Sequence, residues 1–378
     1  MWRGVVPESE GVAGMAEWRM VAATERQRTR FGETPRYAEG LYDLGNRVYA
    51  WMVPNGSWGE SNAGLVAGEG ESLLVDTLWE LYYTGEMLRA MEPITGEAPT
   101  RYVVNTHADG DHIWGNGLMR EAEIVMTAAC DLEARELKPA AMTMLGRAGK
   151  ALGKLGGRKA KKIGNYFHHM VAPYDFRGVE VKAATRTFEG ETSLQVGGRE
   201  VRLIEVGPAH TRGDLVVYVP DAKTVFCGDM VFAGSTPVLW AGSVENWVAA
   251  LEKILDMDVD VVVPGHGPVC DRSAAARVKE YWEFLGHEAG RRFEAGMSAG
   301  DAAYDIARSG VFARQAFAGW DSPERVMTNT HVIYRHLQRR GGHLKAAERL
   351  NILRRQALLA YEFPAAAPAS MHRLEGEA

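Results

Sequence analysis

Residues 105–112 have the sequence Asn-Thr-His-Ala-Asp-Gly-Asp-His and directly follow the apolar run Arg101–Val104. Two histidines and two aspartates therefore stand within six residues, a density that is costly to bury and poor for packing. Imidazole nitrogen and carboxylate oxygen are natural ligands of zinc or iron, and Gly110 lets the loop fold tightly enough for them to converge. The segment indicates a metal site; the alternative, for this segment alone, is a solvated polar loop.

Three further polar segments each follow a strand-like run. Residues 207–214 have the sequence Gly-Pro-Ala-His-Thr-Arg-Gly-Asp, residues 228–229 are Gly-Asp, and residues 264–268 are Pro-Gly-His-Gly-Pro. Loops at strand ends are where a rigid scaffold presents ligands and catalytic groups. A single histidine in such a place, such as His210 or His266, is more often an ordinary polar residue than a ligand. The four segments therefore carry the argument together.

Taken in order, these segments resemble the metallo-β-lactamase superfamily. Its members carry His-x-His-x-Asp-His, then a histidine, then an aspartate, then a histidine. The resemblance covers roughly residues 37–285, and Asp76, in the sequence Leu-Leu-Val-Asp-Thr, matches the early strand-end aspartate of that family. The resemblance is specific for fold and metal binding and uninformative for substrate, because this scaffold hosts many reactions.

The resemblance implies two divalent metal ions, with zinc expected and iron or manganese as alternatives. The implied ligands are His107, Asp109 and His210 for the first metal, Asp111, His112 and His266 for the second, and Asp229 as the bridge between them. Asp76 would orient the ligand loops through hydrogen bonds. A hydroxide held between the metals would be the nucleophile, and Asp111 would be the catalytic residue that accepts the proton.

These residues predict a metal-dependent hydrolase that acts on a small ester, lactone, thioester or amide. Two metal ions about 3.5–4 Å apart lower the pKa of a bound water and polarise a carbonyl or phosphoryl oxygen. We expect no serine nucleophile of the kind that a Gly-x-Ser-x-Gly elbow presents.

One position departs from the family, because the superfamily usually has histidine where this chain has Asp109. A carboxylate is a harder, negatively charged ligand, so it favours iron or manganese over zinc. A carboxylate here resembles the flavodiiron proteins, so the alternative function is a di-iron oxidoreductase or oxygenase. The flavodoxin-like domain of those proteins is not expected, because the C-terminal part has a helical pattern. Asp109 could also stay unligated, which would leave one tight and one weak site.

The order of strands and helices predicts an α/β fold. We expect an αββα sandwich of two mixed β-sheets flanked by helices, with a helical insert and a helical C-terminal region. The expected divisions are an N-terminal extension over 1–36, a metallo-β-lactamase-like domain over 37–271 with the insert at about 128–175, a helical region over 272–361 and a disordered tail over 362–378. The insert is expected to form helices broken by its glycines, which are Gly146, Gly149, Gly153, Gly156 and Gly157.

Candidates for the substrate pocket are aromatic or histidine side chains that follow expected ligands or end the insert. They are Trp114, Tyr166, Phe167, His168, His169, Phe232 and Trp240. The insert also carries many lysines and arginines. One interpretation is a mobile lid whose basic part attracts an anionic or bulky substrate. The other interpretation is an amphipathic helix with a solvated basic face, or an oligomer contact, with the aromatic residues in the core.

Composition excludes several classes of function. The net charge is −6 and the pI about 6.0, which argues against extended nucleic-acid binding. No secretory signal and no apolar stretch of about 18 residues is visible, so we expect no membrane partner. The three cysteines lack Cys-x-x-Cys spacing, which is typical of a reducing compartment, and a cytoplasmic location is expected. The expected partners are a small-molecule substrate and, as a possibility, further copies of the chain.

Overall fold

The computed structural model describes residues 18–341 and 344–375. It contains an eight-stranded sheet in the order β1 to β8 and a five-stranded sheet in the order β13-β12-β11-β10-β9. The strands of the first sheet are β1 (Arg19–Ala23), β2 (Gly40–Asp43), β3 (Val48–Met52), β4 (Ala63–Ala67), β5 (Ser72–Val75), β6 (Thr100–Val104), β7 (Glu123–Thr127) and β8 (Arg186–Phe188). Those of the second are β9 (Glu191–Val196), β10 (Arg199–Glu205), β11 (Leu215–Val219), β12 (Thr224–Phe232) and β13 (Val261–His266).

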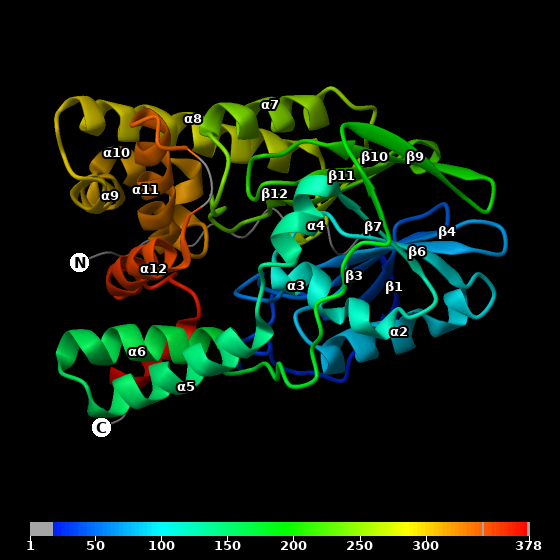
Figure 1. Cartoon of the computed structure of the whole chain (residues 1–378), viewed down its shortest axis with the longest axis horizontal. Coiled ribbons are helices and arrows are strands. Elements are labelled where there is room, and N and C mark those ends of the chain that lie inside the picture. Colours follow the sequence, from blue (N-terminus) through cyan, green and yellow to red (C-terminus); the bar gives the residue numbers. More distant parts are fainter. Residues whose placement is uncertain (1–17, 342–343, 376–378) are drawn as a thin grey trace.

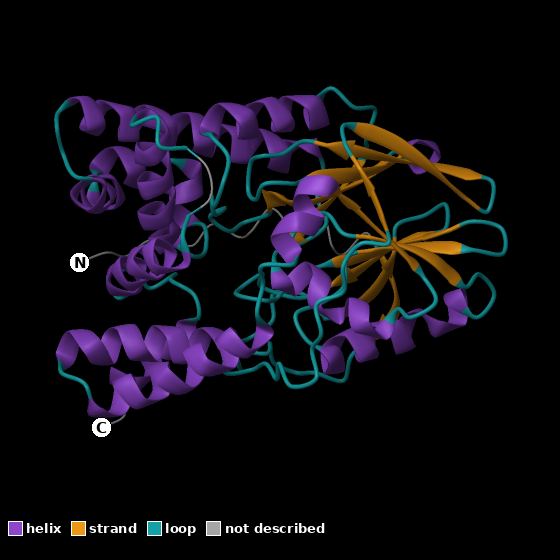
Figure 2. Ribbon diagram, in the orientation of Figure 1, coloured by secondary structure: helices purple, strands orange, loops and turns teal. Residues whose placement is uncertain are grey.

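The two sheets are mixed and lie face to face (Figures 1 and 2). Strands β5 to β8 pair in parallel, as do β12 and β13, whereas the remaining neighbours pair antiparallel. The outer face of the first sheet is covered by α2 (Leu81–Thr95). That of the second sheet is covered by α7 (Val244–Leu255) and α8 (Arg272–Glu294). The predicted αββα sandwich is therefore confirmed.

Alternation along the strands explains why the sheets stack. In β5, Leu73 and Val75 point into the core between the sheets, whereas Leu74 points toward α2. In β12, Phe226 joins the core between the sheets and Val225 packs toward the helices on the other side. Because each central strand buries both faces, its sequence is apolar throughout rather than alternating with polar residues.

Most of the remaining helices lie beside the sandwich, although the two short helices that follow β6 and β7 lie against it (Figure 1). The remaining helices are α3 (Gly110–Ile113), α4 (Ala128–Ala134), α5 (Pro139–Leu155), α6 (Arg158–Val171), α9 (Ala299–Arg308), α10 (Gly310–Ala313), α11 (Val326–Leu337) and α12 (Ala346–Ala360). No described helix combines the length and the hydropathy that crossing a bilayer requires.

The glycines of the insert do not break its helix where the sequence pattern predicted. Helix α5 continues through Gly146, Gly149 and Gly153 and ends only at Gly156. These glycines face α6: a Cβ added at Gly149 would lie 2.8 Å from the carbonyl oxygen of Gly164. They thus allow two helices to pack closely, a benefit that outweighs the low helix propensity of glycine.

Both ends of the chain are more ordered than expected. Strand β1 lies within the predicted N-terminal extension and pairs with β2, and neither strand was identified from the sequence. The predicted disordered tail is also wrong for residues 362–375, because Met371 is fully buried and residues 369–375 form a 3-10 helix. Its apolar contacts lie on other segments, so the composition of the tail alone does not reveal them.

Candidate metal centre

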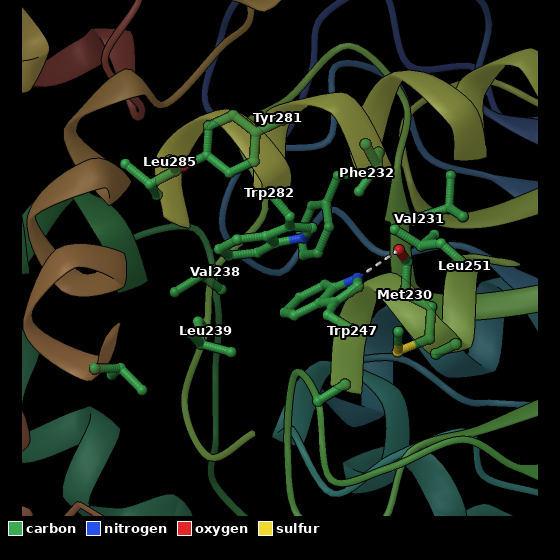
Figure 3. Packing of buried hydrophobic residues seen from close by; sticks show 14 of the residues in the cluster. Met230, Val231, Phe232, Val238, Leu239, Trp247, Leu251, Tyr281, Trp282 and Leu285 are labelled. Carbon is green, nitrogen blue, oxygen red and sulfur yellow. Dashed lines mark hydrogen bonds between the residues drawn. The ribbon is translucent and has the colours of Figure 1, made fainter. Parts of the chain in front are cut away.

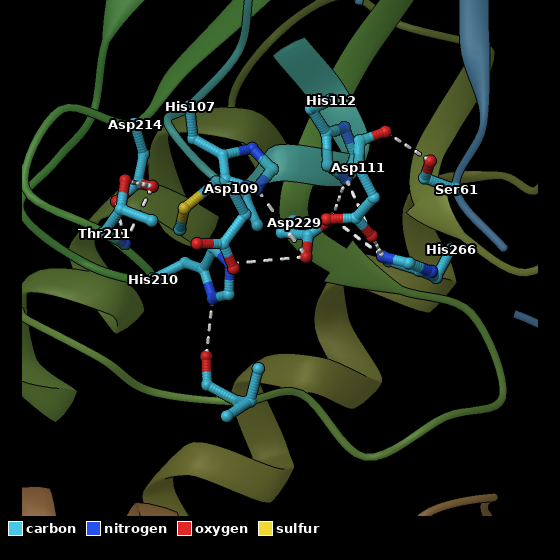
Figure 4. Close-up of polar contacts among 12 residues, drawn as sticks. Ser61, His107, Asp109, Asp111, His112, His210, Thr211, Asp214, Asp229 and His266 are labelled. Atoms are coloured by element: carbon cyan, nitrogen blue, oxygen red, sulfur yellow. Dashed lines mark hydrogen bonds and ion pairs between the residues drawn. The ribbon is translucent and has the colours of Figure 1, made fainter. Parts of the chain in front are cut away.

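The four polar segments identified from the sequence meet at one end of the sandwich (Figure 4). His107, Asp109, Asp111 and His112 follow β6 or lie in α3, and Asp229 lies within β12. His266 ends β13, and His210 lies in the loop between β10 and β11. Parallel neighbours place their carboxyl ends at the same edge of a sheet, which is why segments so distant in sequence converge.

Asp229 lies between two groups of side chains. Its Oδ2 is 3.3 Å from Nε2 of His210 and 3.8 Å from Nε2 of His107. Its Oδ1 is 3.2 Å from Nε2 of His112 and 3.5 Å from Nε2 of His266. The two carboxylate oxygens therefore face different groups, as a bridging ligand would.

Each group gathers three side chains whose ligand atoms lie within 4.8 Å of one another. The first group is His107, His210 and Asp229; the second is Asp111, His112 and His266. Asp109 adjoins the first group, since its Oδ2 is 3.2 Å from Nε2 of His210. The structure thus brings together all seven residues that the sequence analysis expected to bind metal.

All four imidazoles direct Nε2 toward the centre because Nδ1 is engaged elsewhere. Nδ1 of His107 is 3.0 Å from Thr106 Oγ1, and Nδ1 of His112 is 2.9 Å from Asp76 Oδ2. Nδ1 of His210 and of His266 donate to backbone carbonyl oxygens, those of Val238 (2.6 Å) and Glu60 (3.1 Å). Such partners select the tautomer in which Nε2 has a free lone pair for a metal.

The donor set fits divalent cations. Nε2 of His107, Nε2 of His112 and Oδ1 of Asp229 are buried and have no hydrogen-bond partner among the described residues. Orphaned buried polar atoms are costly, so an ion between them would remove a penalty. The carboxylates of Asp76, Asp109, Asp111 and Asp229 also concentrate negative charge that two divalent ions would balance.

The charged neighbours shift the pKa values of these groups. Burial lowers the pKa of His107 well below its ordinary value, and the nearby His112 adds to this effect. Burial also disfavours the charged form of His210, but the hydrogen bond with Asp109 and the charge of Asp229 raise its pKa to about 9. Burial opposes ionisation of Asp229, yet the nearby imidazoles hold its pKa well below the usual range. The carboxylate of Asp229 is thus kept ionised, as a bridging ligand requires.

Asp76 does not belong to either group of ligand atoms, but it hydrogen-bonds to residues of the ligand segment. Its Oδ1 accepts from the backbone N–H of Thr106 at 2.7 Å, and its Oδ2 accepts from Thr106 Oγ1 at 2.7 Å and from His112 Nδ1 at 2.9 Å. Its backbone has φ +61°, a left-handed conformation that aspartate and asparagine tolerate better than most residues. One buried carboxylate therefore orients both ends of the 105–112 segment.

Asp76→Asn is expected to lower zinc affinity by about 10–100-fold. Asparagine keeps the left-handed backbone, but its amide cannot accept all three hydrogen bonds that Asp76 receives, so His112 loses its orientation. A zinc titration against a competing chelator measures the effect. Asp221→Asn, which removes an exposed carboxylate beside Arg199, is the matched control and should leave zinc affinity unchanged. Equal affinities for the two variants would contradict this role for Asp76.

Two further supports were not singled out from the sequence as site residues. Asp214 accepts from the backbone N–H groups of Ala209 and Thr211 and from Thr211 Oγ1, and this shapes the loop that carries His210. Ser61 Oγ donates to the carbonyl oxygen of Asp111 at 2.6 Å. Asp214 is the last residue of the Thr-Arg-Gly-Asp turn, and this turn sequence is the local signal that could have identified it as a support of the site.

The candidate pocket residues fall into different places. Phe232 stacks on His266, with ring centroids 5.1 Å apart and planes 4° apart, and the backbone N–H of Trp240 donates to the carbonyl of His210 at 2.9 Å. Trp114 is buried and packs against Gly110 of the ligand segment, because a Cβ added at Gly110 would lie 2.5 Å from its ring. Tyr166 and Phe167 are buried in packed apolar surroundings, and His168 and His169 lie half-buried on α6. Among the seven candidates, Phe232 and Trp240 therefore contact expected ligand residues, and Trp114 contacts the loop that carries them.

Arg349 of α12 was missed in the sequence analysis. Its guanidinium carbon lies 3.8 Å from the ring centroid of Trp240. Burial opposes ionisation of Asp109, but the hydrogen bond with His210 and the charges of His210 and Arg349 lower its pKa. Asp109 and Asp111 are the most exposed members of the centre, at 23% and 15% of their side chains. Arg349 thus places a cation near its open side, and no local sequence signal connects it to Asp109.

A Gly-x-Ser-x-Gly sequence does occur at residues 296–300, contrary to the expectation from the sequence. It joins α8 to α9, and Ser298 caps α9 and bonds to Asp301 at 2.6 Å. A nucleophile elbow requires a turn from a strand into a helix, so this serine lacks the necessary context.

Comparison with known proteins places this geometry in a family. A model of the metallo-beta-lactamase superfamily matches residues 56–266. The chain is 30% identical over 134 residues to the 2,4-dinitroanisole O-demethylase subunit alpha of Nocardioides sp. (strain JS1661), a match covering 34% of this chain and 35% of that one. It is 37% identical over 65 residues to a hydroxyacylglutathione hydrolase of Synechococcus sp. (strain JA-3-3Ab), covering 17% and 25%. It is 25% identical over 241 residues to an acyl-coenzyme A thioesterase of Gallus gallus, covering 60% and 75%.

Among solved structures, the chain is similar to the inverting sec-alkylsulfatase Pisa1 from Pseudomonas sp. The TM-score is 0.65 with 15% identity, over 88% of this chain and 60% of that one. At this identity the similarity supports the fold alone. This chain spans well under two thirds of the demethylase subunit and of the bacterial hydrolase it matches.

Proposed function

Because the chain belongs to the metallo-beta-lactamase superfamily, we propose that it is a metal-dependent hydrolase that cleaves a small ester, lactone, thioester or amide. The observation that carries the proposal is the position of Asp229, whose two oxygens face two separate groups of ligating side chains. Relatives named as a thioesterase and a hydroxyacylglutathione hydrolase support the hydrolytic class.

We propose the ligand assignment that the resemblance implies, with zinc as the expected metal. His107, Asp109 and His210 would hold one ion, Asp111, His112 and His266 would hold the other, and Asp229 would contact both. Bound in this way, two ions lower the pKa of water to near neutrality and polarise the scissile carbonyl. The chain holds the donors in place through the Nδ1 hydrogen bonds of the imidazoles. Asp111 has Oδ2 3.5 Å from Nε2 of His266 and part of its side chain exposed, so it would be placed to accept the proton of an attacking water.

The open side of the centre favours a substrate that carries a negative charge near the scissile bond. Arg349 is half-buried and lies flat against Trp240. Among the described residues it forms no ion pair with a carboxylate within 4 Å, so its hydrogen-bond donors are available to a ligand. A guanidinium held on an aromatic face is suited to bind a planar or tetrahedral anion.

A screen of metal-loaded protein against matched substrate pairs tests the function. Each pair is a lactone, an ester or a thioester with and without a carboxylate near the scissile bond. Turnover that a chelator removes is expected, and the anionic member should have a KM lower by about tenfold or more. Arg349→Met should abolish that preference, whereas Arg354→Met, at an exposed position on the same helix, should keep it. The proposed function fails if metal-loaded protein hydrolyses no member of any pair.

Asp109 favours one alternative, a di-iron oxidoreductase or oxygenase. Its carboxylate lies 3.2 Å from His210 Nε2, where a hard ligand to iron could act. Iron in the purified protein, together with oxygen consumption in the presence of a reductant, would support this alternative over hydrolysis.

A further inference from the structure

The hairpin of α5 and α6 has a charge unlike that of the rest of the chain. Residues 138–174 contain eight lysines and arginines and no aspartate or glutamate, in a chain whose net charge is −6. The exposed ones are Lys138, Arg147, Lys150, Lys154, Arg158, Lys159 and Lys161. None of these seven forms an ion pair within 4 Å with a carboxylate of the described residues. The hairpin is therefore a concentrated, unneutralised basic surface.

The side chains of helix α5 form three different faces along the helix. Its glycines pack against α6, as described above. Arg147, Lys150 and Lys154 occupy a second face. The third face is apolar and exposed: Met144, Ala148, Ala151 and Leu155 recur at the spacing of one helix face, with Leu152 beside them. Met144 is 70% exposed and Leu155 is 88% exposed.

This apolar face has no partner among the described residues, and the fold leaves it open. Helix α6 lies between α5 and α12, so α5 forms the outer edge of the molecule there (Figure 1). Exposed apolar residues that form a continuous stripe beside a row of basic residues mark an interaction surface rather than ordinary solvent exposure.

We propose that the α5–α6 hairpin docks on an anionic lipid surface. Lysine and arginine bind lipid headgroups while the stripe from Met144 to Leu155 enters the boundary of the acyl chains. Pairing the stripe with the same stripe of a second copy is unfavourable, because it would bring two basic rows together with no carboxylate on either hairpin. The expectation that the chain has no membrane partner rested on its lack of an apolar spanning stretch, and docking at a membrane surface needs no such stretch.

Sedimentation of the full chain with vesicles tests the proposal. Binding is expected with phosphatidylcholine vesicles that contain phosphatidylglycerol, much less with phosphatidylcholine alone, and it should weaken as salt is added. Lys150→Gln/Lys154→Gln should lower the partition coefficient by about 30-fold, since each basic residue near such a surface contributes about fivefold. Leu155→Ser should weaken binding without changing its salt dependence.

The matched control is Lys182→Gln/Lys253→Gln, which removes two exposed lysines outside the hairpin and should leave vesicle binding unchanged. Equal sedimentation with neutral and anionic vesicles, or equal loss in the hairpin and control variants, would overturn the proposal. Light scattering provides a second test that could refute the proposal. If the chain is a dimer, Leu155→Glu makes it a monomer and neither form binds vesicles, the stripe is an interface with a second copy. Failure of this proposal would not affect the proposed hydrolase function, because the metal centre and the hairpin share no residue.

Discussion

Asp229→Asn is expected to lower kcat by on the order of a thousandfold or more and to reduce the bound metal to one ion per chain or fewer. The carboxylate supplies one anionic oxygen to each group of ligands, 3.2 Å from His112 on one side and 3.3 Å from His210 on the other. An amide has the same shape but offers one weaker oxygen, and it turns N–H donors toward the imidazoles. Both measurements, elemental analysis and turnover of the best substrate, are made on the same preparation.

Asp258→Asn is the control for this substitution. Asp258 is exposed and pairs with Lys223 at 3.0 Å, and neither residue belongs to a segment that carries a ligand. Its variant should keep both the metal content and the turnover of the unaltered chain. If Asp229→Asn binds two metal ions and retains more than about a tenth of kcat, Asp229 is not the bridge.

Trp247→Ala is expected to lower the free energy of unfolding by about 3–5 kcal/mol. Trp247 is fully buried in α7, its ring lies 4.5 Å from that of Trp282, and its Nε1 donates to the carbonyl of Met230 at 3.1 Å (Figure 3). Truncation leaves a cavity and an unsatisfied carbonyl together. Urea unfolding followed by circular dichroism measures the loss, and an unchanged m-value shows that the denatured state is the same.

Trp247→Phe separates the two contributions. The ring is largely retained, so the loss should fall to about 1–3 kcal/mol, which is the cost of leaving the Met230 carbonyl unpaired. The same ring lies 6.0 Å from that of His210, so the alanine variant should also weaken the first metal group. A loss below about 1 kcal/mol for Trp247→Ala would show that the helices on this sheet do not depend on that core.

The strands at the metal centre could be predicted because their sequences are locally distinctive. The apolar run Arg101–Val104 coincides with β6 to within one residue, and polar residues directly after such a run contribute little to packing. The ligand set came instead from the resemblance to the metallo-β-lactamase superfamily, and its assignment to metal ions stays a prediction. Asp76 was identified through the same resemblance, because it matches the strand-end aspartate of that family.

The parts that sequence did not reveal depend on contacts between distant segments. Glycines such as Gly149 were interpreted as helix breakers because their benefit lies in α6, which no local pattern includes. Met371 was assigned to a disordered tail because the residues that bury it come from elsewhere. Arg349 gains significance only from Trp240 and Asp109, which stand more than a hundred positions earlier.

Elemental analysis of the unaltered protein, purified without added metal or chelator, tests the dinuclear centre most directly. Two divalent ions per chain are predicted, and two zinc ions would agree with the proposed hydrolase. Two iron ions would retain the centre and favour the oxidoreductase. No metal in the purified protein, and none taken up on reconstitution, would contradict the dinuclear centre and the function proposed from it.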